Sequence, residues 1–140
     1  MKKNHRAITV LLLTLLCFAA VAHSVSAQQE AGKEAFSIER LVVCSGIENR
    51  EPVGAADTFP ASTETVYAFL EATSIPEDTQ VTFVWYHGDK ELSSVTMPVK
   101  AGARWRTYAS KRLAGLTGEW KVELKDAAGT ALKSIAFKVE

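Results

Sequence analysis

Short runs of apolar and β-branched residues, separated by turn residues, make up the chain from Phe36 onward. The clearest run is residues 119–126 (EWKVELKD), in which Trp120, Val122 and Leu124 alternate with polar or charged side chains. Alternation with a period of two residues is typical of a β-strand that buries one face. We therefore predict a strand here whose three apolar side chains point into a core.

The same pattern predicts seven strands in all. Residues 65–72 are apolar on both faces, which indicates a central strand, and residues 87–90 form a turn typical of a β-hairpin. Residues 48–60 hold two prolines and a glycine, and we predict that they form a loop. The predicted strands are residues 37–47, 65–72, 80–87, 91–99, 104–110, 119–126 and 131–139.

Seven short strands with antiparallel turns favour an all-β fold, an immunoglobulin-like antiparallel β-sandwich. Trp85 ends a Val-x-Phe-x-Trp pattern that resembles the core strand of such folds, although the cysteine pair of antibody domains is missing. We predict that Trp85, Trp105 and Trp120 supply the main aromatic core.

The first residues have the pattern of a cleavable secretory signal peptide. A basic start precedes an uncharged apolar run at residues 7–22, and Val-Ser-Ala at residues 25–27 is typical of a cleavage site. A membrane-spanning helix needs about 18 or more apolar residues, so a cleaved signal is favoured over an anchor. We predict cleavage between Ala27 and Gln28, and we expect contact with a membrane only where this segment is kept.

Three parts follow from this pattern. Residues 1–27 are the predicted signal peptide, residues 28–36 a short polar tether, and residues 37–140 the β-sandwich domain. Cleavage would leave 113 residues, which is enough for one domain with its own core.

The charge balance argues against nucleic acid as a partner. The chain has 16 basic and 16 acidic residues, but three of the basic ones lie in the predicted signal peptide, which leaves 13 against 16. Proteins that bind nucleic acid need a basic surface to neutralise phosphates. We therefore expect no nucleic-acid partner.

Six short segments between Val42 and Val139 keep the order and spacing of a known family: residues 49–53 (NREPV), 66–69 (VYAF), 81–86 (VTFVWY), 104–108 (RWRTY), 110–111 (SK) and 118–122 (GEWKV). In these segments the chain resembles the bacterial family catalogued as domain of unknown function 2914. The resemblance implies an exported or membrane-tethered envelope domain, periplasmic or secreted, in a bacterium of Gram-negative type. It implies no activity, because the family has none assigned.

Few residues after the signal peptide could carry catalysis. Cys44 is the one cysteine left and lies in an apolar run, so we predict a buried, unreactive thiol. His87 is the one histidine left, and no Gly-x-Ser-x-Gly elbow accompanies it, so we predict a solvated turn residue. A copper site built from Cys44, His87 and Met97 would lack a second histidine. We expect no metal, no cofactor and no catalytic residues.

One candidate binding surface lies on and beside the predicted strand 104–110. Alternation places Trp105 and Thr107 on one face and the arginines on the other. Two guanidinium groups about 7 Å apart beside a phenol suit an anionic or sugar-like ligand. The candidate binding residues are Arg104, Arg106, Tyr108, Ser110 and Lys111.

The alternative is that these arginines pair across strands with glutamates such as Glu71, Glu91 or Glu119. The favoured function is non-enzymatic binding of an envelope protein or a cell-wall glycan. A purely structural extracytoplasmic domain is the alternative, and an enzyme of unknown type is less favoured because no acid–base pair stands out.

Overall fold

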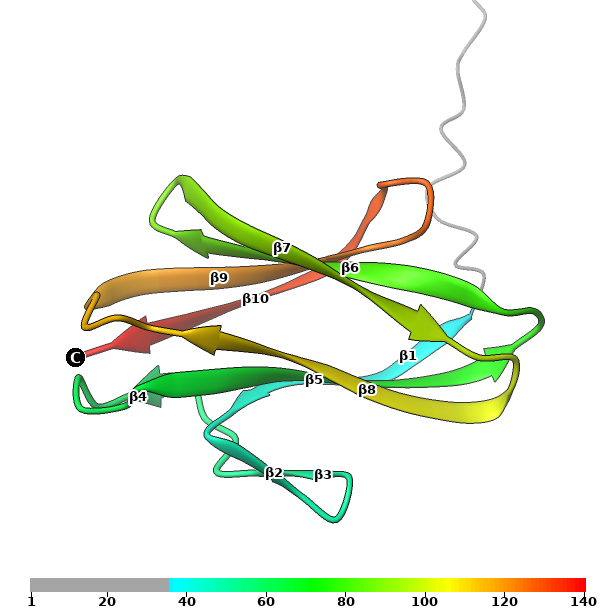
Figure 1. Cartoon of the computed structure of the whole chain (residues 1–140), viewed down its shortest axis with the longest axis horizontal. Coiled ribbons are helices and arrows are strands. Elements are labelled where there is room, and N and C mark those ends of the chain that lie inside the picture. Colours follow the sequence, from blue (N-terminus) through cyan, green and yellow to red (C-terminus); the bar gives the residue numbers. More distant parts are fainter. Residues whose placement is uncertain (1–35) are drawn as a thin grey trace, which may run out of the picture.

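Residues 36–140 are described by a computed structural model and form an all-β domain of two facing sheets and a small hairpin (Figure 1). One sheet has the strand order β1-β5-β8 and the other β4-β10-β9-β6-β7, while β2 and β3 pair with each other. The predicted immunoglobulin-like β-sandwich is confirmed. The strands are β1 (Ser37–Cys44), β2 (Gly46–Glu48), β3 (Glu51–Val53), β4 (Thr58–Phe59), β5 (Thr65–Ile75), β6 (Thr79–His87), β7 (Lys90–Val99), β8 (Gly102–Arg112), β9 (Gly118–Lys125) and β10 (Ala131–Val139).

The N-terminal part of the domain contributes to both sheets. β1 pairs antiparallel with β5, whereas β4 pairs parallel with β10, the last strand. The β2–β3 hairpin lies between these two strands in the sequence and projects below the three-stranded sheet (Figure 1). The crossing of the chain from one sheet to the other therefore leaves a hairpin on the outer face of β1-β5-β8.

The core between the sheets is aromatic. Trp85 and Trp120 are each 1% exposed, and Phe137 contacts both, with ring centroids 6.3 Å and 5.9 Å away. Val122 and Leu124 are fully buried beside Trp120, as the alternation in β9 predicts. Aromatic side chains bury about 150–250 Å² each, so these three rings are a major source of the stability of the sandwich.

Trp105 does not belong to this buried core, and the prediction that it does is wrong. Its side chain is partly buried and packs against the rim of the core, where Nε1 donates a hydrogen bond to the carbonyl oxygen of Pro98 at 3.0 Å. β8 is an edge strand of its sheet. Alternation predicts the face on which a side chain lies, but not its distance from the centre of the sheet.

The prediction that residues 48–60 form a loop is wrong in part. Two short strands, β3 and β4, lie within this range, and the first predicted strand ends at Cys44 instead of residue 47. Asn49 and Arg50 form a two-residue turn with φ angles of 51° and 63°. Strands of two or three residues are too short to show a period, and Pro52 is tolerated because β3 pairs on one side only.

The predicted signal peptide (residues 1–27), its cleavage site and the tether up to residue 35 lie outside the described residues. Within residues 36–140 there is no helix of the length and apolar character needed to cross a membrane.

Candidate binding site

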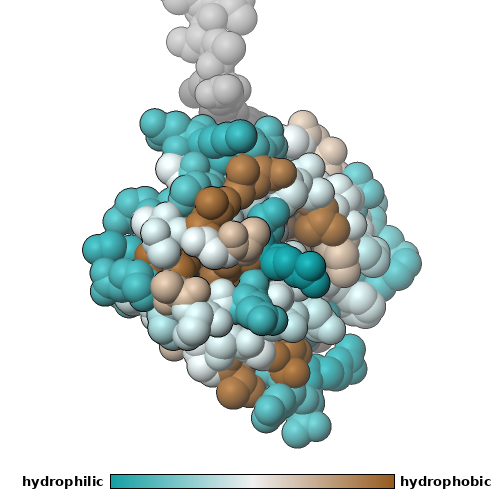
Figure 2. Space-filling model, turned by 60° about the vertical axis from the view of Figure 1, so that its left-hand side comes forward, coloured by the Kyte–Doolittle hydropathy of each residue, from teal (hydrophilic) through white to brown (hydrophobic). Residues whose placement is uncertain are grey.

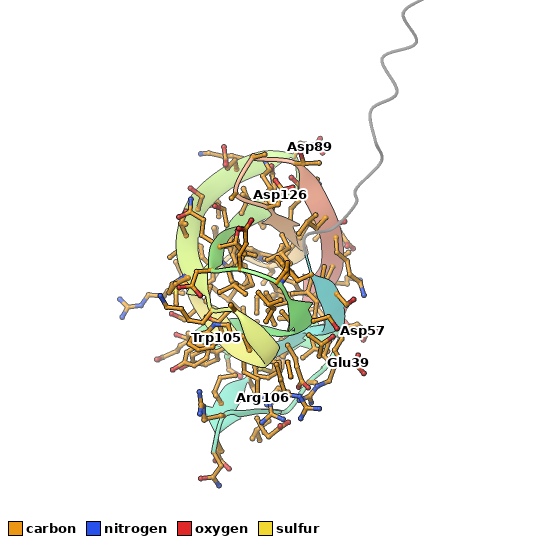
Figure 3. The ribbon with its side chains drawn as sticks, turned by 90° about the vertical axis from the view of Figure 1, so that its right-hand side faces the viewer. Glu39, Asp57, Asp89, Trp105, Arg106 and Asp126 are labelled. Carbon is orange, nitrogen blue, oxygen red and sulfur yellow. The ribbon has the colours of Figure 1, made fainter. Side chains whose placement is uncertain are left out.

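Charged side chains from four strands meet on the outer face of the three-stranded sheet. Arg40 of β1 is paired in register with Glu71 of β5, and Glu71 is paired in register with Arg106 of β8. The β2–β3 hairpin adds Glu51 from β3. Figure 3 shows Arg106 on the side of β8 that faces this hairpin. The fold thus brings together residues that are far apart in the sequence.

Glu71 is the centre of this cluster. Glu71 is 3% exposed. Its carboxylate accepts a hydrogen bond from Nε of Arg40 at 3.0 Å and another from Nε of Arg106 at 3.3 Å. Arg104 makes an ion pair with it, with Nε 3.1 Å from Oε1. The hydrogen bonds from Arg40 lower the pKa of Glu71 despite burial. A buried charge is stable only when it is paired, so Glu71 holds three arginines on this face.

Glu51 connects the hairpin to the sheet. Its Oε2 accepts a hydrogen bond from Nη1 of Arg40 at 3.0 Å, and its Oε1 lies 2.8 Å from Nη1 of Arg106. The hydrogen bond from Arg40 lowers the pKa of Glu51. The hairpin is therefore held over the sheet by the same arginines that neutralise Glu71.

The cross-strand pairing that the sequence left as an alternative is thus present, with Glu71 as the partner. In the part of the chain that the structure describes, neither Glu91 nor Glu119 pairs with Arg104 or Arg106. Both glutamates belong to strands of the other sheet. The side chain of Arg104 remains 59% exposed although it pairs with Glu71.

Two hollows adjoin the cluster. The cationic hollow, of about 250 Å³, is lined by Arg50, Arg104, Trp105 and Arg106. The aromatic hollow, of about 240 Å³, is lined by Ile47, Arg50, Phe69, Arg106 and Tyr108. Because Arg50 and Arg106 line both, the hollows are neighbours, and the second is the more apolar of the two.

The aromatic hollow has a well-packed floor and an exposed rim. Phe69 is buried, with the guanidinium of Arg40 5.1 Å from its ring centroid. Tyr108 is 46% exposed and packs edge-on against Tyr67, with ring centroids 5.9 Å apart. Figure 2 shows hydrophobic side chains beside hydrophilic ones at the lower end of the molecule, where the hairpin lies. The hollow can accept an apolar or flat group next to a cation.

The predicted site residues are only partly brought together. Arg104, Arg106 and Tyr108 line the hollows, whereas Ser110 lines neither and pairs in register with Tyr67. Lys111 lies on the opposite face of β8, the face of Trp105, because the strand continues through Arg112 and keeps its alternation. The strand ends later than predicted, and this separates Lys111 from the arginines.

Sequence reasoning missed several residues of this site. The alternation in β1 does not predict the face of Arg40, because the pairing register shifts between Ile38 and Arg40. Arg50 and Glu51 lie in what the sequence predicts to be a loop, although residues 49–53 carry part of the family resemblance and could have pointed to them. Phe69 looks like an ordinary core residue in an apolar run.

Cys44 and His87 lie away from the hollows. Cys44 is buried, with Sγ 3.6 Å from the carbonyl oxygen of Tyr67, and burial raises the pKa of its thiol, so the predicted buried cysteine is confirmed. His87 is not simply solvated as predicted: its Nε2 donates to the carbonyl oxygen of Thr117 at 2.7 Å, and its ring packs 4.9 Å from Trp120. Among residues 36–140 no three His, Cys, Asp or Glu side chains are arranged to hold a metal ion.

Comparison with protein families supports the resemblance seen in the sequence. The model of a family described as "Protein of unknown function (DUF2914)" matches residues 78–139. Residues 78–139 are a DUF2914 match. The DUF2914 range runs from the start of β6 to the end of β10 and includes Arg104, Arg106 and Tyr108. The predicted resemblance is confirmed over this range, whereas residues 49–53 and 66–69 lie outside it.

Solved structures with a similar fold include an immunoglobulin-like protein from Pseudomonas aeruginosa, at 13% identity and a TM-score of 0.46, covering 74% of this chain and 92% of that one. A β-glucosidase from Listeria innocua is 6% identical with a TM-score of 0.47, both as a mutant in complex with laminaribiose and in complex with isofagomine. These matches cover 75% and 74% of this chain but 16% of each β-glucosidase chain, so this chain spans a small part of that enzyme's length. No curated protein matches the chain.

Proposed function

We propose that this immunoglobulin-like domain is a non-enzymatic binding module of the bacterial envelope. We further propose that its recognition surface is the arginine face, which we define as Arg40, Arg50, Arg104 and Arg106 with the two hollows beside them. Among these four arginines and their partners Glu51 and Glu71, two positive charges are in excess. A surface of this kind attracts an acidic ligand.

The observation that carries the proposal is that Arg50 has no ion-pair partner among residues 36–140 and that Arg104, although paired with Glu71, stays 59% exposed. Arg104 pairs with Glu71 through Nε, and within residues 36–140 it pairs with no second carboxylate. Arg50 is exposed and pairs with no carboxylate in the same part of the chain. Both line the cationic hollow. A guanidinium binds a carboxylate through two parallel hydrogen bonds, and these two are available for that purpose.

The backbone at Arg50 supports a role in binding. The residue has a φ of 63°, and the two-residue turn with Asn49 is one in which glycine is preferred at this position. A left-handed conformation costs a non-glycine residue about 1–2 kcal/mol. An arginine that bears this cost, makes no ion pair within residues 36–140 and lines both hollows is better explained by a ligand than by stability.

Export is part of the proposal. The apolar run at residues 7–22 and the Val-Ser-Ala pattern before Gln28 support delivery to the periplasm or to the outside of a Gram-negative-type cell. The partner is then an envelope protein or a cell-wall glycan, and both classes offer carboxylates. Arginines stay protonated and supply no general base, which favours binding over catalysis.

Photocrosslinking in living cells tests the proposal. A photoreactive amino acid replaces Tyr108, at the rim of the aromatic hollow, and the adducts are recovered from periplasm and wall. We expect an adduct that is lost with Arg50→Ser plus Arg104→Ser. Arg112→Ser is the matched control, because Arg112 is exposed on the same strand but lines neither hollow. The proposal is refuted if this domain stays inside the cell. It is also refuted if the adduct forms equally well in the double variant.

A further inference from the structure

We infer that the arginine face binds an acidic segment of a protein partner in extended conformation. A carboxylate of that segment lies between Arg50 and Arg104, and an apolar side chain two positions away along the segment enters the aromatic hollow. This inference rests on the proposed function and specifies which class of ligand the arginine face binds.

The molecule itself shows the first contact. Glu51 belongs to β3, an extended strand that lies against the outer face of the sheet, and its carboxylate reaches Arg40 and Arg106. A glutamate on extended backbone is thus already bound by two arginines of this face. Arg50 and Arg104 both line the cationic hollow, and no carboxylate of the described residues lines it with them.

Glu71 prepares Arg104 for such a contact. The ion pair at Nε holds the guanidinium against a carboxylate that is itself fixed by Arg40 and Arg106. The two terminal nitrogens are the edge that remains for an end-on, bidentate bond to a second carboxylate. Since the side chain is already oriented, less of its conformational freedom is lost when the ligand binds.

The size of the hollows favours single side chains. Pockets for drug-sized molecules measure about 300–1,000 Å³. The cationic and aromatic hollows measure about 250 and 240 Å³. Each therefore suits one side chain of a peptide better than a larger ligand, and the ring of Tyr108 at the rim can cover an apolar group.

The arrangement of the hollows sets the spacing. Side chains two positions apart on an extended peptide point to the same side and are separated by about 7 Å. The two hollows are neighbours that share Arg50 and Arg106 as walls. We therefore infer that the segment carries its acidic and its apolar residue two positions apart.

Calorimetric titration of the purified chain with short synthetic peptides tests the inference. The probe has one glutamate and a leucine two positions on, in a background of serine and threonine. We expect saturable binding that weakens with salt. Binding should weaken at least about tenfold when the glutamate is replaced by glutamine, because a charge-assisted contact is lost. Arg50→Ser and Arg104→Ser should have the same effect for the same reason. Moving the leucine next to the glutamate should also weaken binding, because the two side chains then no longer point to the same side of the peptide. Arg112→Ser should leave the affinity unchanged.

Arg50→Gly is the second variant, because glycine suits the turn and the hairpin will keep its shape. Loss of peptide binding in this folded variant supports the inference, and unchanged binding overturns it. Soluble wall fragments that carry muramic acid are titrated in parallel. Binding of these fragments and not of the peptides, with the same dependence on Arg50 and Arg104, overturns the inference but keeps the proposed function. Binding of neither, while the cellular adduct still depends on both arginines, also overturns only the inference.

Discussion

Nε of Arg104 lies 3.1 Å from Oε1 of Glu71, so that an exposed arginine on the edge strand is tied to a buried carboxylate on the neighbouring strand. The contact runs diagonally, because Glu71 faces Arg106 in the register of β5 and β8. One carboxylate thereby orients three guanidinium groups. The stability of the arginine face and its capacity to bind a ligand both depend on this residue.

Replacement of Glu71 should destabilise the domain. Glu71→Gln leaves Arg40, Arg104 and Arg106 close together without their shared carboxylate. Breaking a fully buried ion pair costs about 3–5 kcal/mol, and we expect about 2–3 kcal/mol here because the arginines reach water. Urea unfolding of the variant measures the change. Glu91→Gln, a change at an exposed position outside this cluster, is the control, and equal stabilities of the two variants would contradict the prediction.

Acid should weaken the domain through the same carboxylates. The arginines hold the pKa values of Glu71 and Glu51 below the ordinary value for a glutamate. In the unfolded chain the pKa of a glutamate is about 4.3. Between these values the unfolded chain binds more protons, so stability falls as the pH falls. The contribution is complete above about pH 5 and is lost as the pH drops through the lower, folded values.

Unfolding free energies at neutral and at acidic pH check this dependence. The unaltered chain should lose more stability on acidification than Glu71→Gln, which has already lost one of the two carboxylates. Parallel losses in both proteins would show that the acid sensitivity arises elsewhere.

Arg50→Gly should separate binding from stability. Glycine adopts the left-handed conformation of this turn without strain, but it also makes the unfolded chain more flexible. We expect the free energy of unfolding to stay the same or to rise by up to about 1 kcal/mol. Thermal melting measures it. A marked fall in melting temperature would mean that the Arg50 side chain stabilises the hairpin.

The tryptophans should differ sharply in their contribution to stability. Trp120→Ala removes a ring that is buried and stacked on Phe137, which typically costs about 3–5 kcal/mol. Trp105→Ala removes a partly exposed side chain at the rim, so its cost should be clearly smaller. Denaturant titrations of the two variants give the comparison, and equal costs would place Trp105 in the core after all.

Cys44 should resist alkylation in the native protein. Its thiol is buried and its pKa is raised by burial, so the reactive thiolate is scarce and inaccessible. Iodoacetamide labelling, followed by mass analysis of the peptide that contains Cys44, should be slow without denaturant and fast with it. Rapid native labelling would show that the hairpin opens readily from the sheet.

The predicted strands at residues 80–87, 91–99 and 131–139 agree closely with β6, β7 and β10. Their prediction succeeds because an exposed face and a buried face impose a two-residue period, which is a local property of the chain. The same pattern in β9 predicts the inward direction of Trp120, Val122 and Leu124 correctly. The face on which Arg104 and Arg106 lie follows from the pattern for the same reason.

The composition of the site depends on contacts between distant parts of the chain. Arg40, Glu71 and Arg106 are widely separated in sequence and meet because β1, β5 and β8 are paired in a particular register. A one-residue shift in that register would turn the side chains to the other face. The position of Arg50 depends on the hairpin, whose strands are too short to leave a periodic signal. The sequence by itself therefore determined the class of fold and the direction of most side chains, whereas only the packing of the three-stranded sheet and its hairpin decided which charges are paired and which remain open.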